Sequence, residues 1–252
     1  KAKLEITEAL KPNSPLIINN DDDMLSKEGP NLNKKYNLIT IAIDNKSTYN
    51  ATNIEDNVFS STFNINNDKI NINVGSKAFI YNSLVAYAVG KILKIDSKDI
   101  IDAIAKFKLS PHRLEKKVSK TGITIIDDTY NANQDSMINS LSILSKVKNK
   151  RRVAILADIL ELGGYTEEIH ENISKKVTPN TLDILITVRE NAKLIAKKKK
   201  KNNFKSTNIY TFKDYKDCLE NVQTLLSKND IVLVKGSHGM NLIKVVEELL
   251  KI

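Results

Sequence analysis

The second half of the chain alternates short, wholly apolar segments with segments in which apolar side chains recur at helical spacing, and this alternation constrains the fold most strongly. Short apolar strands that alternate with helices are typical of a parallel sheet covered by helices on both faces. The expected elements are strands at 123–127, 152–157, 183–187 and 230–234 and helices at 135–147, 167–177, 189–200 and 214–227. The predicted fold class is therefore α/β, with a Rossmann-like, doubly wound and mostly parallel sheet.

The first 108 residues have a mixed pattern, which predicts a second domain of different construction. The expected elements are an amphipathic helix at 1–10, a strand within 15–25 that ends in three acids, a strand within 36–44, an antiparallel hairpin within 51–74, and helices at 78–95 and 97–108. Ser97 is the expected N-cap of the last helix. We place the domain boundary after residue 108, because Pro111 follows a long interval without proline.

The composition is that of a globular protein without a membrane-spanning segment. No run approaches the ~18 apolar residues that a membrane helix needs, so we expect no membrane insertion. The formal charge is +9, but the lysines are scattered except at 196–206, which is typical of a solvated loop. We therefore expect no nucleic-acid partner, although a basic surface suits a polyanionic small molecule. The single cysteine, Cys218, excludes an internal disulfide and fits a reducing, cytoplasmic setting.

Polar loops follow the predicted strands at the edge where a doubly wound sheet binds ligands. "DDTYNANQD" follows the first strand, "DILELGG" the second and "KGSHGM" the last. Their carboxylates, amides, lysine and glycines suit a metal–nucleotide complex or an anionic substrate. Asp127 and Asp128 are adjacent, so they point to opposite sides and only one is expected to face a ligand. From spacing alone, a structural cluster of helix caps and Asx turns remains the alternative.

Three segments together resemble the Mur ligase family. They are "GITIIDDTYNANQDSM" (122–137), "RRVAILADILELGGYTEEIHENI" (151–173) and "VLVKGSHGM" (232–240). The YNAN form is similar to the members that add D-alanyl-D-alanine in peptidoglycan synthesis, the MurF type, and "PHRLE" (111–115) is similar to a G-R-x-E at the family's domain junction. The first half matches more loosely, through "AKLEI", "INNDDDM" and "YNSLVAYAV". The resemblance thus spans most of the chain and is most specific in the second half.

The resemblance implies an ATP-dependent amide ligase. The γ-phosphate of ATP would pass to a carboxylate of UDP-MurNAc-tripeptide, and the amine of D-Ala-D-Ala would attack the acyl phosphate, with release of ADP and phosphate. ATP and Mg²⁺ would be the cofactors, and we expect a monomer. In such a site, positioning and electrostatics supply most of the rate.

The resemblance also implies roles for individual residues. Nucleotide contacts would come from Asn82, Arg113 and Asp128. Substrate contacts would come from Asn131, Asn133, Asp158, Glu161, Lys235, Ser237 and His238. Lys3 matches a family lysine that is carbamylated in several members, and it would then help to hold a magnesium ion. The catalytic set implied is Lys3, Asp128, Asn131 and Asn133.

The sequence departs from the family pattern at several places, among them Gln134 for proline, Ala157 for glycine and Ile159 for methionine. Ala78 and Phe79 stand where the family has His-Asn, and His238 stands where it has arginine. No G-x-x-G-K-[ST] phosphate loop occurs in the 252 residues. We expect that loop, with the uridine-nucleotide domain, upstream in a longer chain. The chain would then be the latter part of a central ATP-binding domain (1–108) and a C-terminal ligase domain (109–252), inactive by themselves.

Two other functions stay open at this stage. The chain could be a non-catalytic or split module that binds nucleotide or substrate and needs a P-loop partner; sequence upstream of Lys1 would distinguish it from a ligase. It could also be a basic nucleic-acid-binding α/β domain. That alternative predicts salt-dependent DNA binding without any requirement for ATP or D-Ala-D-Ala.

Overall fold

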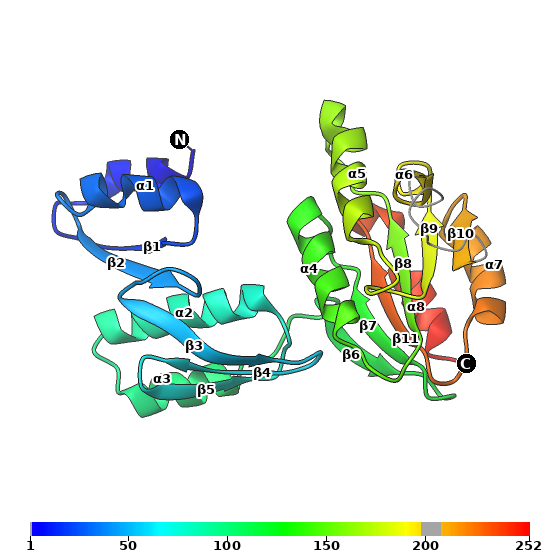
Figure 1. Ribbon diagram of the computed structural model, residues 1–252, viewed down its shortest axis with the longest axis horizontal. Coiled ribbons are helices and arrows are strands. Elements are labelled where there is room, and N and C mark those ends of the chain that lie inside the picture. The colour runs from blue at the N-terminus through cyan, green and yellow to red at the C-terminus, as the bar shows by residue number, and fades with distance from the viewer. Residues whose placement is uncertain (1, 198–207) are drawn as a thin grey trace. The chain divides into compact units, whose positions relative to one another are not determined.

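The structure, a computed structural model, describes residues 2–197 and 208–252, and side chains from residue 4 on. The chain divides into two compact units, the first ending at Phe107 and the second running from Lys108 to Ile252 (Figure 1). The α/β class predicted from the sequence is confirmed, with mostly parallel sheets. Part of the expected helix at 189–200 and most of the lysine-rich segment at 196–206 lie outside the described residues.

The first unit is built on a five-stranded sheet in the order β1-β2-β3-β4-β5. The first three strands are parallel neighbours, and the last two add antiparallel pairs. Its strands are β1 (Pro15–Asn19), β2 (Asn37–Ala42), β3 (Tyr49–Asp56), β4 (Ser61–Ile65) and β5 (Asp68–Ile72). Its helices are η1 (Ala2–Ala9), α1 (Asp23–Leu32), α2 (Lys77–Ile92) and α3 (Ser97–Ala105).

Four local features of the first unit differ from the sequence prediction. The expected hairpin within 51–74 is a three-stranded meander, and the opening helix is a 3-10 helix. The N-cap of α3 is Asp96, so the assignment of Ser97 was wrong; the Ser97 hydroxyl instead binds the Lys91 ammonium. Helix α1 was not predicted, because Pro30 and the acids before it indicate a loop; it begins where the Asp22 carboxylate accepts the N–H groups of Met24 and Leu25.

The second unit is built on a six-stranded sheet in the order β10-β9-β8-β11-β7-β6, parallel except for β6. Its strands are β6 (Glu115–Val118), β7 (Thr124–Asp128), β8 (Arg152–Ala157), β9 (Ile184–Val188), β10 (Ile209–Phe212) and β11 (Ile231–Lys235). Every residue of β7, β9 and β11 is buried, as expected for strands covered on both faces. The four predicted strands are confirmed.

Helices cover both faces of this sheet. They are α4 (Gln134–Ser145), η2 (Gly163–Tyr165), α5 (Thr166–Lys176), α6 (Lys193–Lys197), α7 (Tyr215–Leu225), η5 (His238–Met240) and α8 (Ile243–Leu249). Alternate residues of β7, β8, β9 and β11 form one core with α7 and α8, in which Cys218 is wholly buried. Helix α4 packs against β8 and β11 and against α5. Helix α8 and the edge strands β6 and β10 were missed by the sequence prediction.

Length and apolar character together decide whether a helix can cross a bilayer. Among the residues that the structure describes, no helix has enough of both.

A test of the packing in the first unit is the substitution Gly75→Ala. A Cβ atom at Gly75 would lie 1.6 Å from the carbonyl oxygen of Asn57, so backbone must move. We expect a loss of about 1–3 kcal/mol in the free energy of unfolding, measured by urea denaturation. The control is Gly164→Ala, where a Cβ atom meets nothing within 4 Å. Equal stability of both variants would contradict the close approach.

Candidate functional site

Three loops meet at the carboxyl edge of the second sheet. Strand β11 is inserted between β7 and β8, although it follows both in the sequence, so the strand order reverses there. Such a switch point leaves a crevice between the loops that follow neighbouring strands. The loops after β7, β8 and β11 line a pocket of about 610 Å³. Its lining residues are Tyr130, Asn131, Ala132, Asn133, Ile159, Leu160, Glu161, Leu162, Ser237, His238 and Gly239.

The pocket brings together part of the predicted site. Of the residues assigned to substrate binding, Asn131, Asn133, Glu161, Ser237 and His238 line it, whereas Asp158 and Lys235 do not. Glu161 supplies the one carboxylate of the lining. Glu161 is exposed and has a φ of 63°, in the left-handed region. The pocket therefore offers amides, a hydroxyl, an imidazole and a single acid to a ligand.

Asn133 is both a pocket residue and the N-cap of α4. Its side-chain oxygen accepts the N–H of Ser136 at 2.8 Å, and the Ser136 hydroxyl in turn accepts the N–H of Asn133 at 3.1 Å. This is a capping box. The side-chain oxygen of Asn133 therefore caps a helix, as the alternative of a cluster of helix caps and Asx turns predicted. The side-chain oxygen of Asn131 accepts the N–H of Ala132 at 2.9 Å. In both asparagines a backbone N–H thus donates to the oxygen of the side-chain amide.

Ser237 ties the loop after β11 to the loop after β8. Its hydroxyl accepts the N–H of Leu160 at 2.9 Å, and its own N–H donates to the carbonyl oxygen of Asp158 at 3.1 Å. Gly236 permits this approach, because a Cβ atom there would lie 2.7 Å from the Cβ of Ala157. The ends of β8 and β11 are thus held close together under the pocket.

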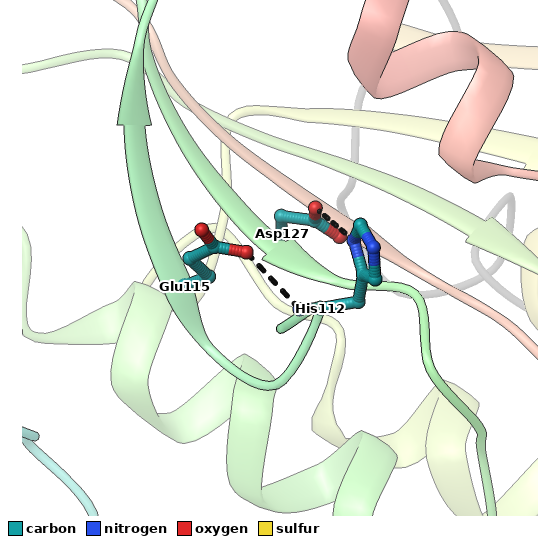
Figure 2. Close-up of side chains that lie close together, drawn as sticks. All are labelled: His112, Glu115 and Asp127. Carbon is teal, nitrogen blue, oxygen red and sulfur yellow. Dashed lines mark hydrogen bonds and ion pairs between the residues drawn. The ribbon is translucent and has the colours of Figure 1, made fainter. Parts of the chain in front are cut away.

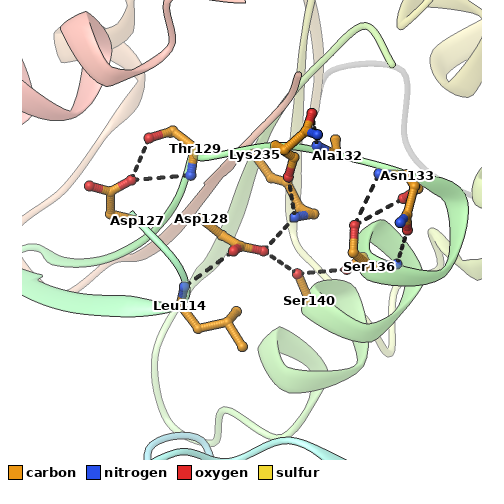
Figure 3. A network of polar contacts seen from close by, with 10 residues as sticks. Leu114, Asp127, Asp128, Thr129, Ala132, Asn133, Ser136, Ser140 and Lys235 are labelled. Atoms are coloured by element: carbon orange, nitrogen blue, oxygen red, sulfur yellow. Dashed lines mark hydrogen bonds and ion pairs between the residues drawn. The ribbon is translucent and has the colours of Figure 1, made fainter. Parts of the chain in front are cut away.

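Lys235 forms a buried ion pair with Asp128. The Lys235 ammonium lies 2.6 Å from Oδ2 of Asp128 and also donates to the carbonyl oxygen of Asn131 at 3.0 Å (Figure 3). Only 2 % of the Lys235 side chain is exposed. Burial lowers the pKa of Lys235 from its ordinary value, and the charge of Asp128 opposes that shift. The same Asp128 oxygen accepts the Ser140 hydroxyl at 2.7 Å, which anchors α4.

Asp127 points to the other side of β7, as the sequence predicted for adjacent residues. Its Oδ2 atom lies 2.8 Å from Nδ1 of His112 (Figure 2), and its Oδ1 atom accepts the Thr129 hydroxyl (Figure 3). The same Oδ2 atom lies 2.6 Å from the Lys117 ammonium. Burial raises the pKa of Asp127, but the hydrogen bonds from Lys117, His112 and Thr129 outweigh it and leave the pKa below its ordinary value.

His112, Glu115 and Asp127 have ligand atoms close enough to one another to hold a metal ion (Figure 2). The Lys117 ammonium, however, lies 2.6 Å from Asp127 and 3.2 Å from Glu115. A cation thus already neutralises these carboxylates, and one of the three donors is a ring nitrogen, which Mg²⁺ does not favour. The cluster fits an internal ion-pair network and does not fit a magnesium site.

Arg113 lies over the ring of Tyr130. Its guanidinium carbon is 4.1 Å from the ring centroid, a cation–π contact, and the ring of His238 lies 6.4 Å from the same centroid. Arg113 is exposed, and Tyr130 is 48 % exposed. The sequence prediction left out Tyr130, although it stands in the YNAN segment between polar residues that it did select.

Asp158 is 5 % exposed, and its Oδ1 atom accepts the N–H of Ala192 at 2.7 Å. Burial raises the pKa of Asp158 above its ordinary value, with the bond from Ala192 opposing that shift. Asp158 thus joins the loop after β8 to the start of α6, and its predicted substrate contact stays a prediction.

His170 of α5 is wholly buried, and its Nδ1 atom lies 2.7 Å from the carbonyl oxygen of Thr166.

The remaining predicted residues lie in the first unit. Asn82 is exposed on α2 and lines an apolar hollow of about 290 Å³ with other residues of α2 and with residues of β5 and α3. Phe79 of α2 and Phe107, which follows α3, also line it, and their rings lie 5.8 Å apart. Lys3 lies in η1, and its side chain is outside the described part of the structure. The nucleotide and metal roles expected of these two residues stay predictions.

The sequence was then compared with known families. The model of the Mur ligase middle domain matches residues 1–90, and that of the Mur ligase, glutamate ligase domain matches residues 112–238, just over half of the chain. The chain belongs to the Mur ligase family. The match over 112–238 agrees with the resemblance carried by the YNAN and KGSH segments, and the match over 1–90 agrees with the looser resemblance of the first half. The named relatives include the MurF type.

Two curated relatives are UDP-N-acetylmuramoyl-tripeptide–D-alanyl-D-alanine ligases. The one from Bacillus subtilis is 27 % identical over all of this chain and 54 % of its own length, and the one from Buchnera aphidicola (Acyrthosiphon pisum) is 31 % identical over all of this chain and 55 % of its own length. The chain therefore spans about half the length of the curated relatives it matches.

Two solved structures share the fold. MurF from Acinetobacter baumannii matches 99 % of this chain with 54 % of its own, at a TM-score of 0.86 and 21 % identity. MurF from Thermotoga maritima in complex with ADP matches 98 % of this chain with 56 % of its own, at a TM-score of 0.80 and 23 % identity.

The buried ion pair predicts a large effect of Lys235→Met. The substitution leaves the Asp128 carboxylate buried without its cation, so we expect a loss of about 3 kcal/mol or more in the free energy of unfolding, measured by urea denaturation. The control is Lys244→Met, because Lys244 forms a long, exposed pair with Glu247 at 3.6 Å and should change nothing measurable. A Lys235→Met variant as stable as the control would contradict the ion pair.

Asp127 predicts a pH dependence of stability. Because the folded pKa of Asp127 is lowered, its ionised form adds stability above the unfolded pKa, near 3.8, and this is lost as the pH falls through the folded pKa. Asp127→Asn should therefore be less stable than the wild type at pH 7, and the difference should shrink below about pH 3.8. Unfolding curves from pH 2 to 7 test this, with exposed Glu220→Gln as control. A difference that stays constant with pH would contradict it.

Proposed function

We propose that this chain forms part of the middle domain and the C-terminal domain of an ATP-dependent ligase that joins D-alanyl-D-alanine to UDP-MurNAc-tripeptide. The observation that carries the proposal is the pocket, whose three loops are those that hold the YNAN, D-x-x-E-L-G and KGS segments. The relatives with that activity match the whole chain. Since this chain spans about half their length, the activity belongs to a longer or assembled enzyme that supplies a G-x-x-G-K-[ST] loop.

The pocket suits the peptide substrates of such a ligase. The amides of Asn131 and Asn133 keep their N–H donors available after their oxygens have capped backbone groups, and such donors suit a peptide carboxylate or carbonyl. Glu161 offers a carboxylate to the ammonium of the incoming dipeptide. His238, in the place of the family's arginine, would add a ring N–H donor.

Nucleotide contacts would come from other residues. Arg113 is an exposed guanidinium that suits phosphate oxygens. Asn82 borders an apolar hollow with two aromatic rings, which suits a purine base, with the amide of Asn82 at its edge. Ala78 and Phe79 replace polar family residues there, so base binding would rest more on apolar contact.

The reaction proposed is a phosphoryl transfer followed by amide formation. The γ-phosphoryl group passes from ATP to the tripeptide carboxylate, the amine of D-Ala-D-Ala attacks the acyl carbon, and phosphate leaves. Mg²⁺ would neutralise the nucleotide phosphates. The chain's own residues would bind and orient the dipeptide amine and stabilise negative charge, which Arg113 and the N–H donors around the pocket can do.

The direct test is a ligation assay with the protein as its source cell makes it. The native polypeptide is purified, its intact mass is measured, and ADP release is followed with ATP, UDP-MurNAc-tripeptide and D-Ala-D-Ala. We expect ADP release that requires all three substrates. A native chain of about 28.3 kDa without ADP release, either alone or with P-loop proteins of the cell added, would overturn the ligase and favour the non-catalytic binding module.

Asn133 allows capping and substrate contact to be separated. Asn133→Ala removes the cap and should lower the free energy of unfolding by about 1 kcal/mol, whereas Asn133→Ser keeps a capping hydroxyl and should not. Both variants lack the amide donor. If that donor binds the dipeptide, both should lower kcat/KM for D-Ala-D-Ala by on the order of tenfold. Wild-type kcat/KM in Asn133→Ser would show that Asn133 only caps the helix.

A further inference from the structure

Arg113 stands in the middle of a strained tripeptide. His112 has a φ of 62° and Leu114 a φ of 50°, so both of its neighbours adopt the left-handed conformation that side chains larger than that of glycine disfavour. Leu114, as a branched residue, is especially unfavourable there. Such a conformation persists only where surrounding contacts hold it.

The contacts that hold it come from the two adjacent acids at the end of β7. Asp127 accepts a hydrogen bond at one end of the tripeptide, where its Oδ2 atom lies 2.8 Å from Nδ1 of His112. Asp128 acts at the other end, where its Oδ1 atom accepts the N–H of Leu114 at 3.2 Å (Figure 3). In addition, the carbonyl oxygen of His112 accepts the N–H of Tyr130 at 3.0 Å.

Both carboxylates are fixed from the interior. Asp127 is wholly buried, and Asp128 is 8 % exposed. The groups that hold them are the Lys117 ammonium and the Thr129 N–H and hydroxyl for Asp127, and the Lys235 ammonium and the Ser140 hydroxyl for Asp128. The tripeptide is thus bonded at both ends to groups that cannot turn away without losing several hydrogen bonds.

We propose that Asp127 and Asp128 clamp His112 and Leu114 and thereby position Arg113 over the ring of Tyr130, for contact with an anionic group of the nucleotide. His112 is then a positioning residue, which acts through Arg113 and does not touch substrate. The clamp itself is a property of this chain; its use in nucleotide binding rests on the proposed function.

Two substitutions of His112 separate the clamp from the strain. His112→Gly removes the side chain and suits a φ of 62°, so it relieves strain while breaking the bond to Asp127. His112→Asn keeps the bond, because the amide nitrogen of asparagine and Nδ1 of histidine are both attached to Cγ, and asparagine tolerates the left-handed region. If the clamp holds Arg113 in place, Arg113 should leave its position over the Tyr130 ring in His112→Gly and keep it in His112→Asn.

The position of Arg113 can be read directly by NMR of this chain. The ring current of Tyr130 should displace the Nε–H resonance of Arg113, which is assigned by its absence in Arg113→Lys and referenced to Tyr130→Leu. We expect the displaced resonance in the wild type and in His112→Asn, and its return to the reference position in His112→Gly at a similar melting temperature. A His112→Gly variant that keeps the displaced resonance would overturn the clamp.

Kinetics of the native ligase then test its use. We expect His112→Gly to raise KM for ATP by on the order of tenfold with little change in kcat, and His112→Asn to behave as the wild type. Adding His112→Gly to Arg113→Ala should cause no further rise, because His112 acts through Arg113. Additive effects would overturn the positioning role. If Arg113→Ala leaves KM for ATP unchanged while the NMR experiment gives the expected result, the clamp stands. The role of Arg113 in nucleotide binding, which belongs to the proposed function, is then overturned.

Discussion

The buried ion pair between Lys235 and Asp128 is the interaction on which the site depends. It joins the last residues of two neighbouring parallel strands, β11 and β7, which are paired with each other in the sheet. An ammonium removed from water to this extent is stable only when its hydrogen bonds are satisfied, and here Asp128 and the carbonyl oxygen of Asn131 accept two of them. Since Asp128 also binds Ser140 of α4, the one pair fixes the strand ends, the YNAN loop and the helix behind it. The pocket keeps its shape for that reason.

The charged residues at the strand ends form a scaffold within the protein, and the ligand contacts expected of Asp128, Asp158 and Lys235 stay predictions. Asp127, Asp128, Asp158 and Lys235 are all buried and bound to groups of the protein, whereas the pocket is lined by amides, a serine, an imidazole, a tyrosine and one acid. This division follows from the sheet. Side chains on the last strand residues point into the layers between sheet and helices, while the residues that follow emerge at the edge. The loop residues are the ones exposed to a ligand in the pocket, and the acids beneath them hold the loops in place.

This division also explains what could be predicted from the sequence. The four strands β7, β8, β9 and β11 were identified because burial on both faces makes their sequences mostly apolar. The loops after them were placed at one edge by topology alone. The edge strand β6, "EKKV", was not predicted, because one of its faces meets solvent and its sequence is therefore not an apolar run. The role of Lys235 could not be predicted, because a lysine after an apolar strand looks the same whether its ammonium meets an anion or a buried aspartate. The aromatic role of Tyr130 depends on Arg113 from a distant loop, which spacing does not reveal.

Backbone strain around the site is consistent with this arrangement. His112, Leu114 and Glu161 all adopt positive φ values, and each costs on the order of 1 kcal/mol relative to an ordinary conformation. The first two are offset by the carboxylates of Asp127 and Asp128, and these carboxylates are in turn fixed by Lys117 and Lys235. The buried ion pairs of the sheet thus stabilise the strained segment that carries Arg113. Weakening either ion pair should therefore affect the position of Arg113 before it affects the strands, because the strands are also held by their own ladders and cores.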